Sequence, residues 1–387
     1  GPLRLRPADN ASVDFMGFRY RDSSVSAGQL ALRQWQNLAN AGSVSLYIMG
    51  HLGNHKDQTA LNASKVAFTF HKEHEALYCG LQSAAKVLLV TKPIMARSDP
   101  EVYGWVRALT ESHIPFDEVK LAELTPELLR RWDVVILGDV KQCNPQQAAM
   151  LDEYAAQGGI VLASGNAPAL QCLGVESVQA KHTDCMSSVF ELCASESALF
   201  PRSAAAHYVV PGACVSEIQF APDTKTMLHM IPEHPFGPPE MCYYTTVTDV
   251  PGLGITPHGK GKGVYIPWSV GSFYYNEGYD NTLHFLQDVL HEVCALPELA
   301  PGLHPSVELT LSKKADTLAV QLVNGSGVFA NSYFEPVPMQ DITLRLPGLA
   351  GKTASAYNGG SVSCADSGDD LILTLDKLNA YEIITVQ

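Results

Sequence analysis

Polar side chains that could bind a ligand follow two predicted strands near the N-terminus. The strands are predicted at 13–20 and 44–49, from short apolar and β-branched runs. Active sites of parallel barrels lie at the carboxyl ends of the strands, so residues just past such strands are candidates for ligand contact. These candidates are Arg19, Tyr20, Arg21, Asp22, His51, Asn54, His55 and Asp57. Contacts to ligand hydroxyl or carboxylate groups are one interpretation of Arg19–Arg21, and ordinary ion pairing within the loop is the other.

The histidines of this region are predicted to bind no metal. His51, His55 and Asp57 have a spacing that resembles zinc ligands, but no thiolate and no clear third ligand accompany them. His71 and His74 are three residues apart on a predicted helix, unlike the four-residue spacing of a metalloprotease helix, and are typical of a solvated helix face. A phosphate-binding glycine loop is not evident either, because the glycine run at 259–263 precedes a strand and is predicted to be a hairpin turn. We therefore expect no cofactor.

Strands and helices alternate strictly from Lys86 to Gly165. Short β-branched runs such as 87–91 and 134–138 are typical of strands that are buried on both faces. Helices are predicted between them at 99–112, 126–132 and 145–157, where parallel pairing requires crossovers. The pattern predicts a doubly wound parallel-sheet domain, an α/β fold.

The flanking regions have other patterns. Two βα units in residues 1–85, with helices at 26–41 and 61–78, cannot close a core alone, because parallel strands need neighbours on both sides. From 173 to 256 the sequence indicates irregular β structure at the edge of the central domain, including a strand at 243–247. An aromatic loop is predicted at 271–278 and a closing helix at 282–293. Alternating strands after 301 predict an antiparallel sandwich.

Composition excludes several classes of partner. The chain has 387 residues, 46% of them hydrophobic, and no apolar run long enough to cross a bilayer. Its formal net charge is −14, and its 26 basic residues form no dense patch, so nucleic acid and anionic membranes are poor candidate partners. The nine cysteines include no C-x-x-C pair. We therefore expect reduced thiols and a cytoplasmic location.

Three stretches resemble a known group of enzymes. They are Gln29–Ser43, Leu46–Gly50 and Phe70–Glu75, and they are similar to the last two βα units of certain (β/α)8 glycoside hydrolases. These enzymes are the family 42 β-galactosidases and the α-L-fucosidase-like and uncharacterised glycosyl hydrolases, in which a β-galactosidase trimerisation domain with a glutamine-amidotransferase-like fold follows the barrel. The resemblance continues through 234–240, 261–268 and the C-terminal β region.

The resemblance implies a layout and a function. Residues 1–85 would be the last βα units of a barrel, 86–300 the amidotransferase-like domain and 301–387 a β-sandwich. The chain would be the C-terminal portion of a glycoside hydrolase that acts on a glycoside or oligosaccharide, forms a homo-oligomer and needs its own upstream barrel segment. Gly17 falls roughly where the β-galactosidases have a strand-ending Glu, and Asp22 is the nearest acid. Asp22 is therefore the candidate catalytic residue.

Two other functions are open. A non-catalytic scaffold or carbohydrate-binding protein of the same fold is one alternative. A small-molecule amidase is the second, and it would require a nucleophile on a tight turn between a strand and a helix. Cys143 lies five residues beyond its strand, and Ser164 lacks the G-x-S-x-G pattern. We therefore predict that the amidotransferase site is absent.

Overall fold

The chain forms two compact units in the computed structural model. The described residues are 9–91, 99–183, 185, 187–212, 214–234, 237–243 and 246–387. The first unit takes the described residues of Gly1–Ala85, His113–Pro115 and Glu298–Gln387, and the second takes those of Lys86–Ser112 and Phe116–Pro297. Among the described residues, no helix has both the length and the apolar character needed to cross a membrane.

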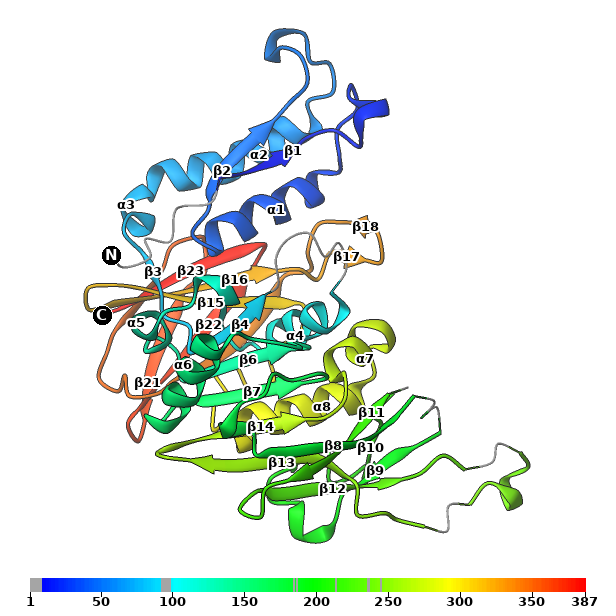
Figure 1. Cartoon of the computed structure of the whole chain (residues 1–387). Coiled ribbons are helices and arrows are strands. Elements are labelled where there is room, and N and C mark those ends of the chain that lie inside the picture. The colour runs from blue at the N-terminus through cyan, green and yellow to red at the C-terminus, as the bar shows by residue number, and fades with distance from the viewer. Residues whose placement is uncertain are drawn as a thin grey trace. The chain divides into compact units, whose positions relative to one another are not determined.

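The N-terminal part of the first unit is a pair of βα elements (Figure 1). Strands β1 (Asp9–Val13) and β2 (Ser43–Tyr47) pair in parallel, and each precedes a helix. The helices are α1 (Ala27–Ala39) and α2 (Thr59–Glu73), with the short α3 (Glu75–Tyr78) after them. Ser26 starts α1 by accepting a hydrogen bond from the Gln29 N–H, a typical N-cap.

The predicted strand at 13–20 is wrong. The strand lies earlier, and the chain turns back on itself after Val13: the Met16 N–H donates to Ser23 O at 3.1 Å, and Phe15 bridges Ser24. Residues 18–20 form a 3-10 turn, η1 (Phe18–Tyr20). Of the apolar residues in this stretch, Phe15 is buried whereas Met16, Phe18 and Tyr20 are exposed, so they do not form one buried face of a strand.

The C-terminal part of the first unit is an antiparallel sandwich. One sheet has the order β20-β23-β16-β15-β3 and the other β19-β22-β21. The strands are β3 (Gln82–Ser83), β15 (Val307–Lys314), β16 (Thr317–Asn324), β19 (Met339–Leu346), β20 (Ala354–Ala356), β21 (Val362–Ser367), β22 (Asp370–Leu378) and β23 (Tyr381–Val386). Leucine, isoleucine and valine side chains from both sheets, such as Leu322 and Leu373, share one buried core. The predicted antiparallel pairing of this region is confirmed.

Helix α1 and the sandwich share a second core within the same unit. The Trp35 ring stacks on Tyr381 with centroids 4.8 Å apart, and Phe70 of α2 meets both rings edge-on. The Tyr381 hydroxyl also donates to Gln321 Oε1 at 2.7 Å, so its polar end is satisfied. The sandwich thus covers the face of α1 that carries Trp35.

The second unit is built on a mixed sheet, which has nine strands in the described part of the chain (Figure 1). Its order is β10 (Tyr208–Val209), β9 (Val189–Glu191), β12 (Lys225–Ile231), β13 (Pro251–His258), β14 (Gly261–Ile266), β7 (Ile160–Ser164), β6 (Val134–Gly138), β4 (Val87–Thr91) and β5 (Phe116–Lys120). The five strands from β14 to β5 are parallel to one another. The four from β10 to β13 pair antiparallel, and β13 joins β14 in the predicted hairpin.

The central strands are buried on both faces, as predicted. Leu88 and Val135 pack with residues of α5 (Pro126–Leu129) and α6 (Pro145–Ala156) in one core. The next residues along these strands, Leu89 and Ile136, point to the opposite face and are also fully buried. A second strand pair, β8 (Val175–His182) and β11 (Val215–Phe220), lies beside the main sheet. The predicted strand at 243–247 falls partly outside the described residues.

The predicted aromatic loop at 271–278 is instead a helix, α7 (Val270–Glu277). Its N-cap residue, Ser269, makes no capping hydrogen bond through its side chain. The Glu101 carboxylate of α4 (Pro100–Glu111) accepts hydrogen bonds from the first amides of α7, Gly271 N–H at 3.0 Å and Ser272 N–H at 2.7 Å. The cap comes from a residue 170 positions away, so the local sequence carries no start signal.

Glycine allows α4 and α7 to approach closely. A Cβ on Gly104 would overlap the backbone carbonyl of Gly271. Glu101 adds a network at the same crossing, because Ser164 Oγ donates to its carboxylate at 2.5 Å and the Trp105 indole N–H donates to Ser164 Oγ at 2.8 Å. The two helices are thus held by backbone contact and by one buried carboxylate. The last helix, α8 (Asp280–Asp288), is followed by a π-helical turn at Val289–Val293.

Gly104→Ala should destabilise the second unit by about 1–3 kcal/mol or more, because the added methyl forces two backbones apart. Urea unfolding followed by circular dichroism measures this. Gly237→Ala is the matched control, since a Cβ there meets no atom closer than 3.8 Å. Equal stability of the two variants would contradict the close approach of α4 and α7.

The Glu101 carboxyl should make stability depend on pH. Burial raises its pKa above the ordinary value of 4.5, although hydrogen bonds from Ser164, Ser272 and Gly271 act in the opposite direction. A raised folded-state pKa means that the folded protein holds the proton more tightly, so this contribution is full below pH 4.5 and is lost as the pH rises through the folded-state pKa.

Glu101→Gln should therefore change the pH profile of the unfolding free energy. The variant loses one hydrogen bond to α7, because an amide nitrogen replaces one acceptor oxygen, and is less stable at low pH. Its deficit relative to the wild type should shrink as the pH rises. Glu176→Gln, at an exposed position, is the control. A deficit that stays constant across pH would show that Glu101 has the same pKa in both states.

Candidate functional site

The parallel pair β1–β2 brings two loops together at one end. Val13 pairs with Tyr47, so both strands end at the same level of the sheet. The Asp14 N–H donates to Tyr47 O at 3.1 Å and continues the ladder by one bond. The loops at 14–26 and 48–58 therefore begin side by side at the carboxyl ends of the strands, where parallel α/β folds place their sites.

A buried ion pair joins the two loops. His55 Nε2 lies 3.0 Å from Asp14 Oδ2, and the two side chains are 5% and 0% exposed. Burial raises the pKa of Asp14 above its ordinary value, and the nearby His55 opposes that rise. The Asp14 carbonyl also accepts the Val25 N–H, so Asp14 is held through its backbone as well. The pair thus fixes the first loop against the second.

Asp57 makes a second connection between the loops. Its Oδ2 accepts the Ser24 N–H at 2.8 Å, and its Oδ1 accepts the Thr59 N–H at 3.1 Å, close to the start of α2. The hydrogen bond from Ser24, followed by those from Thr59, lowers the pKa of Asp57. A carboxylate held by two backbone amides fixes the shape of the loop.

The other predicted residues lie on the exposed tips of these loops. Arg19, Tyr20, Arg21 and Asp22 lie in and just after η1, all exposed. His51 and Asn54 flank and end a 3-10 turn, η2 (Leu52–Asn54), and are also exposed. None of these six side chains forms a hydrogen bond or ion pair with another described residue.

The carboxylates of the two loops differ in what they can do. Within 14–26 and 48–58 the acids are Asp14, Asp22 and Asp57. Asp14 pairs with His55 and Asp57 accepts hydrogen bonds from backbone amides, so Asp22 is the acid of these loops that has no partner among the described residues. Hydrolysis of a glycosidic bond ordinarily requires a pair of carboxyl groups on either side of the bond. These loops offer one.

Apolar side chains surround the same loops. Met16, Phe18, Tyr20 and Leu52 are between 63% and 74% exposed. The rings of Phe18 and Tyr47 both lie against buried Phe15, with centroid distances of 5.6 and 5.9 Å. Exposed rings on a polar loop are surfaces that can stack on a flat apolar face of a ligand or be covered by another segment.

Sequence reasoning missed the importance of Asp14 and His55. The sequence pattern places Asp14 inside the predicted strand at 13–20, whereas it is the first residue beyond β1. The pattern groups His55 with its loop neighbours alone. The placement of an acid immediately after a strand could have indicated Asp14, but no local signal pairs it with a histidine 41 positions later.

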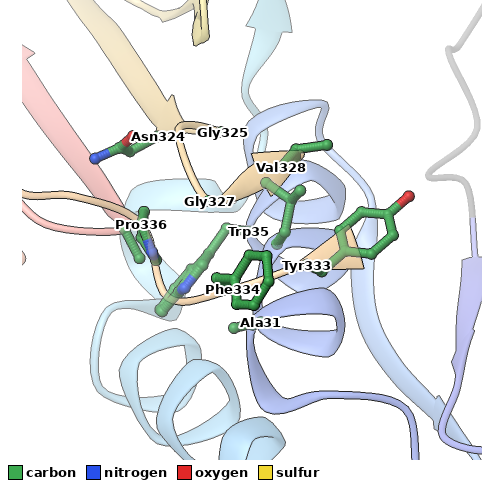
Figure 2. A pocket seen from close by; sticks show the side chains of 12 residues that line it. Ala31, Trp35, Asn324, Gly325, Gly327, Val328, Tyr333, Phe334 and Pro336 are labelled. Atoms are coloured by element: carbon green, nitrogen blue, oxygen red, sulfur yellow. The ribbon is translucent and has the colours of Figure 1, made fainter. Parts of the chain in front are cut away.

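A small cavity lies elsewhere in the first unit, between α1 and the hairpin of β17 (Val328–Phe329) and β18 (Ser332–Tyr333). Figure 2 shows Trp35 and Ala31 of α1 facing Phe334 and Val328. Its volume of about 10 Å³ holds a single water, so no sugar ring fits there. This cavity is a packing gap.

The residues considered for an amidase are engaged in structure. Cys143 precedes the N-cap of α6 and packs against the core, and burial raises the pKa of its thiol, which disfavours the reactive thiolate. The Ser164 hydroxyl donates to Glu101 and accepts from Trp105. A hydroxyl held between these partners is not poised for attack.

Comparison by sequence finds no match. No family model matches the chain. No curated protein matches it either.

Comparison of folds places the chain among glycoside hydrolase structures. It is similar to the α-L-fucosidase isoenzyme 2 of Paenibacillus thiaminolyticus, with a TM-score of 0.75 and 18% identity over 97% of this chain and 59% of that one. It is also similar to the β-galactosidase of Bacillus circulans sp. alkalophilus, with a TM-score of 0.64 and 14% identity over 94% of this chain and 53% of that one.

A third similar structure is Gan42B, a GH42 β-galactosidase from G. stearothermophilus. Its TM-score is 0.59 at 14% identity, over 94% of this chain and 51% of that one. The chain thus spans little more than half the length of these enzymes. The predicted resemblance to a fucosidase and to family 42 β-galactosidases is confirmed at the level of the fold: the chain has a mixed α/β fold similar to these glycosidase structures.

Proposed function

We propose that this chain is the C-terminal portion of a glycoside hydrolase, acting on glycosidic bonds in an α-L-fucosidase-like or β-galactosidase-like reaction. The observation that supports this most directly is the β1–β2 pair, whose carboxyl-end loops present one free acid, Asp22, beside Arg19 and Arg21. In the similar enzymes the matched region is about half of the chain.

An upstream segment of the same protein would complete the site. Parallel strands are normally buried on both faces, whereas Asn10 and Ala11 of β1 and Tyr47 of β2 are exposed. Further strands alongside β1 and β2 would bury this surface and bring a second carboxyl group to the mouth. Asp22 would then serve as one catalytic carboxyl, and Arg19, Tyr20, Arg21, His51 and Asn54 would bind sugar hydroxyls. Asp57 would position its loop.

The remaining regions serve assembly in this proposal. Residues 86–300 form a glutamine-amidotransferase-like domain without amidase chemistry, and the β-sandwich supports the barrel units. The substrate is a glycoside or oligosaccharide, and the protein is a homo-oligomer in the cytoplasm. None of the nine cysteines, all of which lie in the described part of the chain, forms a disulfide, which suits a reducing compartment.

A carbohydrate-binding protein without catalysis is the second candidate. The exposed rings of Phe18 and Tyr20 favour it, because aromatic faces stack on the apolar faces of sugars. Binding of galactose or fucose to this chain, followed by tyrosine fluorescence, together with no turnover in the longer protein, would support this candidate over the hydrolase.

The chain alone should not hydrolyse nitrophenyl α-L-fucoside or nitrophenyl β-galactoside, because one carboxyl group cannot act as both acid and nucleophile. The product of the complete reading frame should hydrolyse one of them. Release of nitrophenol measures both. Clear turnover by the chain alone would contradict the claim that half of the site is missing.

Asp22→Asn in the longer protein should lower kcat by at least about 100-fold if Asp22 acts on the substrate. Asp316→Asn, at an exposed aspartate in the β15–β16 hairpin, is the matched control and should keep full activity. An unchanged kcat in Asp22→Asn would remove Asp22 from the catalytic role.

Exposed tyrosines should contribute to oligomer contacts. Tyr103 and Tyr275 lie on α4 and α7 with ring centroids 5.6 Å apart, and both are nearly half exposed. The double variant Tyr103→Ser/Tyr275→Ser should shift the molecular mass measured by light scattering toward the monomer, while Tyr243→Ser should not. A wild-type chain that is monomeric at all concentrations would contradict assembly through this unit.

A further inference from the structure

Three side chains with metal-ligating atoms meet at the edge of the large sheet. Cys193 immediately precedes η5 (Ala194–Glu196), Glu196 ends that turn, and His229 lies in β12. The Cys193 sulfur, a Glu196 carboxylate oxygen and a His229 ring nitrogen all lie within 4.8 Å of one another. The sequence gives no sign of this group, because its members are 3 and 33 residues apart and form no metal motif.

Backbone hydrogen bonds hold the group in place. The Cys193 N–H donates to Glu196 Oε2 at 3.1 Å, and the Glu196 N–H donates in return to the Cys193 carbonyl oxygen at 2.9 Å. The Leu228 N–H donates to Glu196 Oε1 at 3.3 Å. Each carboxylate oxygen therefore accepts one hydrogen bond and keeps a lone pair for a cation.

The backbone beside His229 is strained. Leu228 is fully buried and has φ of +63°, in the left-handed region that a leucine rarely adopts. This conformation directs the Leu228 N–H to Glu196, and the next residue along the strand is His229. A single strained residue therefore helps to place two of the three ligating groups, as is common at binding sites.

We propose that Cys193, Glu196 and His229 bind one Zn²⁺, with water in the fourth position. A thiolate, an imidazole and a carboxylate together suit zinc, whereas calcium and magnesium prefer oxygen ligands alone. Cys193 and His229 are half-buried, so an ion and a water can reach them. Glu191, directly across from His229 in the β9–β12 ladder, adds negative charge beside the site.

Zinc binding would tie η5 to β12. The thiol loses its proton to solvent when the sulfur coordinates the ion, so affinity falls at low pH. The ion links a turn to a strand near the antiparallel edge of the sheet, away from the loops of the candidate site in the sequence. The site is independent of the proposed glycosidase function, and its role is structural.

The test is zinc titration of chelator-treated chain by calorimetry, with Co²⁺ substitution read by absorption. We expect one Zn²⁺ to bind per chain. The Co²⁺ form should show a charge-transfer band from a single thiolate sulfur to the metal, together with the d–d bands of a tetrahedral site. Cys193→Ser and His229→Asn should each weaken zinc binding more than the loss of a residue that only hydrogen-bonds to a metal ligand, which costs about 10–100-fold in affinity. Cys364→Ser and His258→Asn, a half-exposed strand histidine, are matched controls and should bind as the wild type does.

A conservative variant separates ligation from folding. Cys193→Asp keeps an anionic ligand, so it should retain part of the zinc affinity while losing the charge-transfer band. Circular dichroism shows whether each variant is folded. If Cys193→Ser and His229→Asn both fail to fold, the proposal is tested by the Co²⁺ spectrum of the wild type and by the change of that spectrum in Cys193→Asp. No stoichiometric binding by the wild type, or equal binding by Cys193→Ser, would overturn the proposal.

Discussion

Parallel strands must bury both of their faces and share their hydrogen-bonding edges with neighbours, and both units of this protein are arranged around that requirement. In the second unit it is met within the described chain. Leu88 and Leu89 of β4 point to opposite faces and are both fully buried. In the first unit β1 and β2 form a two-stranded pair, and α1 turns its aromatic side to the sandwich through Trp35. The exposed residues of β1 and β2 are the basis for proposing an upstream segment.

A buried carboxylate organises the crossing of α4 and α7 in the second unit. Glu101 lies among Ser164, Trp105 and the first amides of α7. Each of its oxygens has a partner, and burial raises its pKa. Such a network stabilises the crossing of α4 and α7.

The loops after β1 and β2 show the opposite arrangement. Asp14, His55 and Asp57 hold the loops in place through an ion pair and backbone hydrogen bonds, while Asp22 and the arginines beside it are exposed. A firm loop base with free polar groups at its tip is typical of a binding surface supported by a rigid scaffold. One acid of these loops is without a partner among the described residues, whereas hydrolysis of a glycosidic bond ordinarily requires two carboxyl groups.

Local periodicity was enough to predict the alternating α/β core, the hairpin at 259–263 and the antiparallel strands after 301, because burial repeats along each of these elements. It was not enough for the first strand, where Met16, Phe18 and Tyr20 proved to be exposed on a turned loop, or for α7, whose cap is Glu101 of another helix. The same holds for the pairing of Asp14 with His55 and for the meeting of Cys193, Glu196 and His229. These groups are assembled by tertiary contacts between distant residues, and a pattern in neighbouring positions contains no record of such contacts.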